Sequence, residues 1–133
     1  MRVRRVPALQ HHAAVVEVAG AGWRSGPLLL ARTHRARWRG LRPRARGRGL
    51  LLAGRSVHGR GMREALRVVS LDAAGRVRRV ALLRPKGVFV DRGARWILEL
   101  PPARTAPAVG AVLNVRRLSA VRPAHCAAFD LLP

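Results

Sequence analysis

Residues 56–77 read SVHGRGMREALRVVSLDAAGRV, and the Asp-Ala-Ala-Gly inside this stretch is the strongest turn signal in the chain. An aspartate opens a turn by accepting hydrogen bonds from backbone amides just downstream, and a glycine tolerates the positive φ that closes a four-residue loop. Runs rich in valine and leucine stand on both sides of the turn, at residues 65–71 and 76–83. The pattern predicts an antiparallel hairpin.

The alternative interpretation of this stretch is one helix through residues 62–83. Gly75 argues against a continuous helix because glycine destabilises a helix interior. Val68, Val69 and Val80 argue against it as well, since β-branched side chains favour extended backbone. We therefore expect the hairpin.

Glycine and proline divide the rest of the chain into further short extended segments. The other expected strands are residues 13–19, Leu28–Ala31, Leu50–Ala53, Ser56–His58, Val88–Val90, 94–100 and 111–116. One short helix is expected at residues 34–39, with Thr33 as its N-cap and Gly40 and Pro43 ending it. These elements predict a mostly β protein, either a compact β-sandwich or a distorted barrel, with one short helix.

A chain of 133 residues is long enough for one hydrophobic core. We expect a single β-rich domain at residues 13–117. A basic irregular arm, residues 1–12, precedes it, and a C-terminal tail, residues 118–133, follows it.

The expected strand at residues 94–100 alternates more cleanly than any other segment. Successive side chains of a strand point to opposite faces, so one face carries the large apolar residues while Arg95 and Glu99 point outward. We expect the apolar face to be buried with the alternating valines of the strand at residues 13–19. The predicted core residues are Trp96, Leu98, Leu100, Val16 and Val18.

Several separate blocks of the sequence resemble the domain of unknown function 192 family. They are Ser56-Val57-His58, Gly61-Met62-Arg63 and Leu71-Asp72-Ala73 with Gly75-Arg76-Val77, supported by similar segments at residues 31–33, 39–41, 49–53 and 94–101. The family carries a serine–valine/isoleucine–histidine–threonine–phenylalanine stretch, a methionine–arginine–phenylalanine–proline stretch and a leucine–aspartate–alanine–aspartate–glycine turn. Because that family is largely uncharacterised, the resemblance implies a fold rather than an activity.

The chain departs from this family pattern at three places. It has Gly59-Arg60 where the family has threonine and phenylalanine, and Glu64-Ala65 where the family has phenylalanine and proline. Arg67 stands where the family has an aspartate in the following strand. The roles of those family residues are therefore not transferred to this chain.

The charge balance is strongly basic, with 27 lysine and arginine residues against 6 acids and a formal net charge of +21. Lys86 is the single lysine. Arginine is suited to bidentate contacts with phosphate. The alternative is compositional: arginine, alanine, glycine and proline are all favoured by G+C-rich coding sequence, and the arginines are spread through every segment. Both interpretations stay open at the level of sequence.

Two groups of residues have part of the pattern of a catalytic or metal site, and neither pattern is complete. Ser56 and His58 fall on one strand face, as a nucleophile and base would, but Arg67 occupies the place of the acid that would orient the histidine. The five histidines lack the cysteine or carboxylate spacing of a metal site. We therefore assign no catalytic residue, no metal ligand and no cofactor.

The function expected from the sequence is that of a non-enzymatic ligand- or partner-binding protein. Its candidate ligand-binding residues are Ser56, His58, Met62 and Arg63. The alternative is an accessory protein that binds nucleic acid or another polyanion, without sequence preference, through an arginine-rich surface. The residues expected for polyanion binding are Arg35, Arg37, Arg39, Arg42, Arg44, Arg46 and Arg48.

Cysteine usage and hydropathy bear on the location of the chain. The single cysteine, Cys126, excludes a disulfide within these residues, which fits a reducing compartment. No segment approaches the roughly 20 apolar residues that a membrane-spanning helix needs. We expect a cytoplasmic protein without a membrane span.

Overall fold

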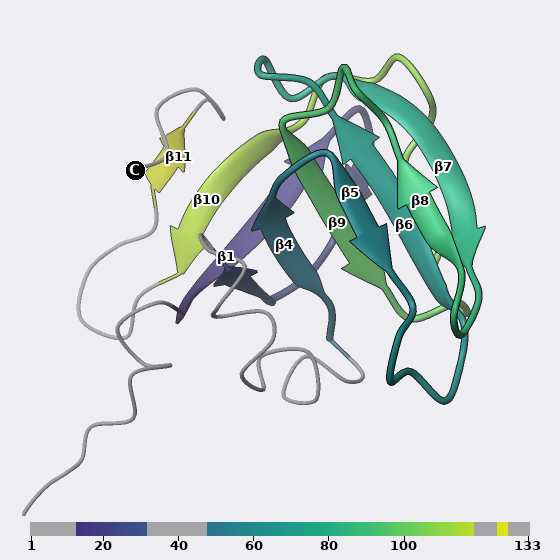
Figure 1. Ribbon diagram of the computed structural model, residues 1–133. Coiled ribbons are helices and arrows are strands. Elements are labelled where there is room, and N and C mark those ends of the chain that lie inside the picture. Colours follow the sequence, from purple (N-terminus) through teal and green to yellow (C-terminus); the bar gives the residue numbers. More distant parts are fainter. Residues whose placement is uncertain (1–12, 32–47, 119–124, 128–133) are drawn as a thin grey trace, which may run out of the picture.

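The structure, a computed structural model, describes residues 13–31, 48–118 and 125–127 (Figure 1). Within these ranges the chain forms strands and turns and no helix. The prediction of a mostly β fold is confirmed. The helix expected at residues 34–39 and the arm expected at residues 1–12 lie outside the described residues.

The described residues form eleven strands in two sheets. These strands are β1 (Ala13–Gly20), β2 (Trp23–Arg24), β3 (Leu28–Ala31), β4 (Leu50–Ala53), β5 (Ser56–His58), β6 (Leu66–Leu71), β7 (Val77–Leu83), β8 (Val88–Val90), β9 (Trp96–Leu100), β10 (Asn114–Leu118) and β11 (His125–Ala127). The main sheet has the order β11-β10-β1-β3-β4-β9-β6-β7, with β2 paired to β1. Strands β5 and β8 form the second sheet. Neighbouring strands are antiparallel except β3 and β4.

The hairpin predicted from the central stretch is present as β6 and β7. The Asp72 carboxylate accepts the N–H groups of Ala74 and Arg76, each at 2.9 Å. Gly75 closes the turn with a φ of +87°, and its N–H donates to the Asp72 carbonyl at 3.0 Å. The turn therefore forms for the reasons that the sequence indicated, namely an aspartate that binds downstream amides and a glycine in the left-handed region.

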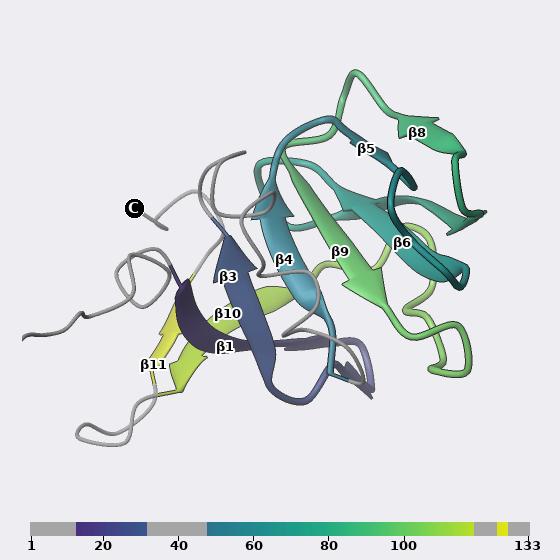
Figure 2. The ribbon, with the colours of Figure 1, turned by 60° about the horizontal axis from the view of Figure 1, so that its bottom comes forward.

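The main sheet curls into a half-barrel (Figure 2). The larger core cluster packs on one of its faces. The cluster contains all five residues expected in the core, which are Val16, Val18, Trp96, Leu98 and Leu100. This prediction is confirmed, because the period-two alternation of β1 and β9 places these side chains on one face.

The small β5–β8 sheet lies over the other face of the main sheet (Figures 1 and 2). Val57 of β5 and Phe89 of β8 are buried, and they share the second core cluster with Ile97 of β9. Glu99 is buried too, with 2% of its surface exposed, so the prediction that it points outward to solvent is wrong. Alternation assigns a residue to a face, but it cannot show that both faces of β9 are covered.

Two predicted boundaries shift at the C-terminal part of the sheet. The strand predicted at residues 111–116 begins at Asn114, as β10. Residues 111–113 are not part of it because they bind the β6–β7 turn. The Val77 N–H donates to the Ala111 carbonyl, and the Leu113 N–H donates to the Gly75 carbonyl. Beyond it, β11 pairs with β10. The sheet thus reaches into residues 118–133, the segment for which the sequence predicted a tail.

Candidate functional site

Ser56 and His58, two of the predicted ligand-binding residues, lie on the outward face of β5. They stand opposite Val90 and Val88 of β8, and the residue between them, Val57, is buried beneath the strand. The His58 Nδ1 accepts the N–H of Arg60 at 3.3 Å. The imidazole is therefore engaged with the start of the loop that follows β5.

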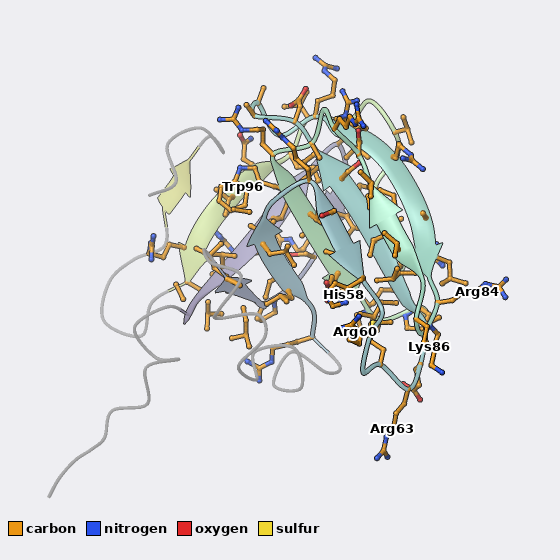
Figure 3. The ribbon with its side chains drawn as sticks, viewed as in Figure 1. His58, Arg60, Arg63, Arg84, Lys86 and Trp96 are labelled. Carbon is orange, nitrogen blue, oxygen red and sulfur yellow. The ribbon has the colours of Figure 1, made fainter. Side chains whose placement is uncertain are left out.

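Met62 and Arg63, the other two predicted ligand-binding residues, lie in this loop and have different surroundings. Met62 is half-buried and packs against the second core cluster, so it anchors the loop. Arg63 is exposed and projects away from the body of the protein (Figure 3). The four residues thus lie close together in the chain and in the fold. Ser56 and Arg63 are exposed, whereas His58 and Met62 are half-buried.

Two loops meet at this end of the molecule, residues 59–65 between β5 and β6 and residues 84–87 between β7 and β8. Gly59 N–H donates to the Gly87 carbonyl at 2.7 Å, and Lys86 N–H donates to the Gly59 carbonyl at 3.0 Å. We call these two segments the loop pair. The backbone hydrogen bonds make the loop pair one unit, although its halves are separated in the sequence by the hairpin.

The close approach of the two loops requires glycine at position 59. A Cβ there would overlap the Arg84 carbonyl oxygen and would lie 2.9 Å from the Lys86 nitrogen. Both obstacles are backbone atoms, which cannot move aside as the end of a flexible side chain could. Packing between the two loops therefore explains the glycine at position 59.

The 84–87 segment is a tight turn with an unusual residue in it. Gly87 N–H donates to the Arg84 carbonyl at 2.8 Å, Pro85 occupies the second position and Lys86 the third, with a φ of +66°. Proline at the second position and positive φ at the third are typical of a type II turn, in which the third residue is normally glycine or asparagine. Here a long cationic side chain stands at that position.

The loop pair is strongly cationic. Arg60, Arg63, Arg84 and Lys86 are exposed there, and their side chains project from the same end of the molecule (Figure 3). No hydrogen bond or ion pair joins these four side chains to other described residues. Glu64 is the one acid in the two segments. Within the part of the chain that the structure describes, these four charges are therefore unpaired.

Most of the acids that could balance the cations are in the interior. Of the five acids among the described residues, three are buried: Glu17, Asp91 and Glu99. Glu17 pairs with Arg116, with 2.6 Å between Arg116 Nη2 and Glu17 Oε1, and lies 3.8 Å from the Arg24 Nε. Glu64 and Asp72 are consequently the only acids of the described residues that are not buried.

Asp91 forms a buried polar cluster that connects the end of β8 to the main sheet. Its carboxylate accepts the Ser70 hydroxyl at 2.7 Å, the Arg78 guanidinium at 2.9 and 3.1 Å, and the Gly93 N–H at 3.2 Å. The hydrogen bonds from Arg78 lower the pKa of Asp91 from 3.8 to about 2, helped by those from Ser70 and Gly93 and opposed by burial.

The arginines expected to bind polyanions fall mainly outside the described residues. Arg48 is described and is exposed, whereas the other six, Arg35, Arg37, Arg39, Arg42, Arg44 and Arg46, lie outside. Exposed cations occur throughout the described part of the chain: Arg24, Arg48, Arg55, Arg60, Arg63, Arg76, Arg78, Arg79, Arg84, Lys86, Arg92, Arg95 and Arg117. Sequence reasoning did not single out the loop pair because its two halves come together only through the pairing of β5 with β8.

No three histidine, cysteine, aspartate or glutamate side chains of residues 13–31, 48–118 and 125–127 gather in a group that could hold a metal ion. The same part of the chain contains no helix long and apolar enough to cross a membrane.

Comparison with known proteins adds no relative to this description. No protein-family model matches the chain, and neither a curated protein nor a solved structure is similar to it. Membership of the domain of unknown function 192 family therefore stays a prediction, and the candidate site must be judged on its own geometry.

Proposed function

We propose that this chain is a small non-enzymatic binding protein whose partner is nucleic acid, held through its phosphates. The observation that carries the proposal is the excess of exposed positive charge: 13 cations of the described residues are exposed, and only two of them, Arg24 and Arg78, form ion pairs with described acids. A positive surface attracts a polyanion at long range and releases its counterions on contact.

A binding role is favoured over catalysis by the state of His58. In a Ser-His-acid constellation the imidazole Nδ1–H donates to the orienting carboxylate and Nε2 takes the proton of the nucleophile. Here Nδ1 accepts the N–H of Arg60, which assigns the ring proton to Nε2 when the imidazole is neutral. That tautomer is the wrong one for a general base acting through Nε2.

The residues that the sequence predicts to bind a ligand are given a role in this proposal as well. They are Ser56, His58, Met62 and Arg63. Met62 is occupied in packing, and the outward side chains lie on β5 and the loop pair, next to Arg60 and Lys86. We propose that this neighbourhood belongs to the polyanion-binding surface. We also propose a cytoplasmic location, for which the single cysteine, Cys126, is the supporting feature.

Sequence-indifferent binding is expected because no recognition helix or base-reading module accompanies the cations in the described residues. The test is a salt titration of the full chain on several unrelated DNA duplexes. Log affinity should fall linearly with log salt, by about 0.9 for each phosphate neutralised, with the same slope for every sequence. Absence of binding at low salt would refute the proposal, as would tight binding to one sequence alone that persists at high salt.

A further inference from the structure

We infer that the loop pair is the principal phosphate-binding site of the protein, and that Lys86 is held in a strained backbone conformation to serve it. The inference rests on the function proposed above and specifies where the nucleic-acid backbone is contacted.

The first argument is the conformation of Lys86. Its φ of +66° lies in the left-handed region, where a Cβ is crowded by the neighbouring carbonyl and glycine is preferred. A glycine or asparagine at this position would satisfy the turn with less strain. Instead the turn carries a long side chain ending in an ammonium group, and such local strain is characteristic of positions where a side chain has a role in binding.

The second argument is that the loop pair forms a defined frame. The hydrogen bonds of Gly59 with Gly87 and Lys86 join its halves, and Met62 packs into the second core cluster below. Pro85 further restricts the backbone of the 84–87 turn. Cations on such a frame keep their spacing, so neighbouring phosphates can be contacted with little additional ordering of the backbone.

The third argument concerns which cations are already engaged. Several exposed or half-buried arginines bind within the protein: Arg78 binds Asp91, Arg79 donates to the Val90 carbonyl, and Arg76 donates to the Gly110 carbonyl. The Arg60, Arg63, Arg84 and Lys86 side chains have no such partner among the described residues. The N–H donors of these four side chains are therefore available to contact phosphates.

Nucleic acid is favoured over an anionic membrane by the apolar residues near the loop pair. The exposed apolar side chains near the loop pair are Leu82 of β7 and Val88 and Val90 of β8, whereas the aromatic Phe89 is buried. Membrane-surface binding typically also uses aromatic side chains that enter the lipid, and none is exposed on β7 or β8.

The experiment compares two triple variants of the full chain that remove the same charge. The loop-pair variant carries Arg60→Ala, Arg63→Ala and Lys86→Gly. The control variant carries Arg55→Ala, Arg92→Ala and Arg95→Ala, at the opposite end of β8, where none of the three side chains binds another described residue. Fluorescence anisotropy would follow binding to two unrelated 20-base-pair duplexes over a range of salt concentrations.

We expect the loop-pair variant to lose about 2.7 from the salt slope, three contacts at about 0.9 each, and the control variant to lose less than about 0.9. The single Lys86→Gly variant should lose about 0.9 from the slope while its unfolding midpoint in urea stays the same or rises. A lower urea midpoint for Lys86→Gly would contradict the argument that Lys86 is strained. The salt slope of the folded loop-pair variant would still show whether the three cations contact phosphates.

Failure of this inference differs from failure of the proposed function. If the wild-type chain does not bind either duplex, the function itself is wrong. If it binds and the two triple variants weaken equally, binding is distributed and the loop pair is not the principal site. If the loop-pair variant loses affinity for phosphatidylserine vesicles but keeps its affinity for DNA, the site serves a membrane and the inference is overturned.

Discussion

Replacing Asp91 by asparagine tests whether the buried polar cluster stabilises the fold, because it keeps the size of the side chain but removes its charge. Asp91 is 6% exposed and accepts hydrogen bonds from Ser70, Arg78 and Gly93. An amide can accept only through its one oxygen, so the second carboxylate oxygen that receives the guanidinium is lost. The expected result is a less stable protein at neutral pH.

The pKa of Asp91 gives the size of the effect. Its value of about 2, against an ordinary 3.8, corresponds to about 2.4 kcal/mol when each pKa unit is taken as about 1.36 kcal/mol. The Arg78 side chain is 41% exposed, so water screens the pair and the full figure is an overestimate. We expect a loss of about 1–2 kcal/mol in the free energy of unfolding.

The pH dependence distinguishes this explanation from simple loss of packing. The folded pKa of Asp91 is lower than the unfolded one, so its contribution is complete above about pH 4 and is lost as the pH falls to about 2. Urea unfolding of the wild type and of Asp91→Asn should therefore differ by a constant amount from pH 7 to pH 5. The difference should shrink between pH 4 and pH 2.

The matched control is Arg92→Ala, which removes an exposed cation next to Asp91 that binds none of the described residues. It should change the unfolding free energy by less than about 0.5 kcal/mol. An Asp91→Asn effect of the same size at pH 7 and pH 2.5 would show that the carboxylate charge is not the cause, and an effect below about 0.3 kcal/mol at pH 7 would refute the reasoning altogether.

Two further predictions concern the core and the loop pair. Leu98 is fully buried in the larger core cluster, so Leu98→Ala should lower the unfolding free energy by about 2–5 kcal/mol, and a loss below about 0.5 kcal/mol in urea titration would contradict its burial. Gly59→Ala should cost about 1–3 kcal/mol because its Cβ would strike the Arg84 and Lys86 backbone, and should separate the two loops. Gly61→Ala is the control variant. Its φ of +81° makes alanine strained, at about 1 kcal/mol, but no atom lies within 4 Å of the new Cβ, so the two loops should stay together. Amide hydrogen exchange at Lys86 should therefore accelerate only in Gly59→Ala.

The sequence was sufficient for the parts of the fold that depend on local chemistry. Asp72 and Gly75 determine a turn through contacts with residues two to four positions away, and the hairpin formed where this chemistry predicted it. The burial of Leu98 with Val16 followed from alternation within each strand. These features need no knowledge of which distant segments pair.

The remaining features depend on pairing between distant strands, which local patterns do not encode. Glu99 lies on the same face of β9 as Ile97, which belongs to the second core cluster, and alternation within β9 does not reveal that this face is covered. The small sheet brings together residues some thirty positions apart, such as Ser56 and Val90. The same pairing creates the loop pair. The sequence identified His58 and Arg63 as members of one candidate site, but it could not place Arg84 or Lys86 beside them.

The strand order also has a consequence for how the chain reaches its folded state. Strand β1 lies between β3 and β10, and Val15 stands opposite Leu118, so one side of β1 is completed only by residues far along the chain. Such non-local pairing is slow, typically on the order of milliseconds to seconds, whereas a local hairpin such as β6–β7 forms in roughly microseconds. A chain emerging from the ribosome would therefore expose the edge of β1 until β10 has been made. In refolding followed by pulsed hydrogen exchange, amides that donate across the β6–β7 pairing should become protected before amides that donate across the β1–β10 pairing, and the reverse order would exclude this sequence of events.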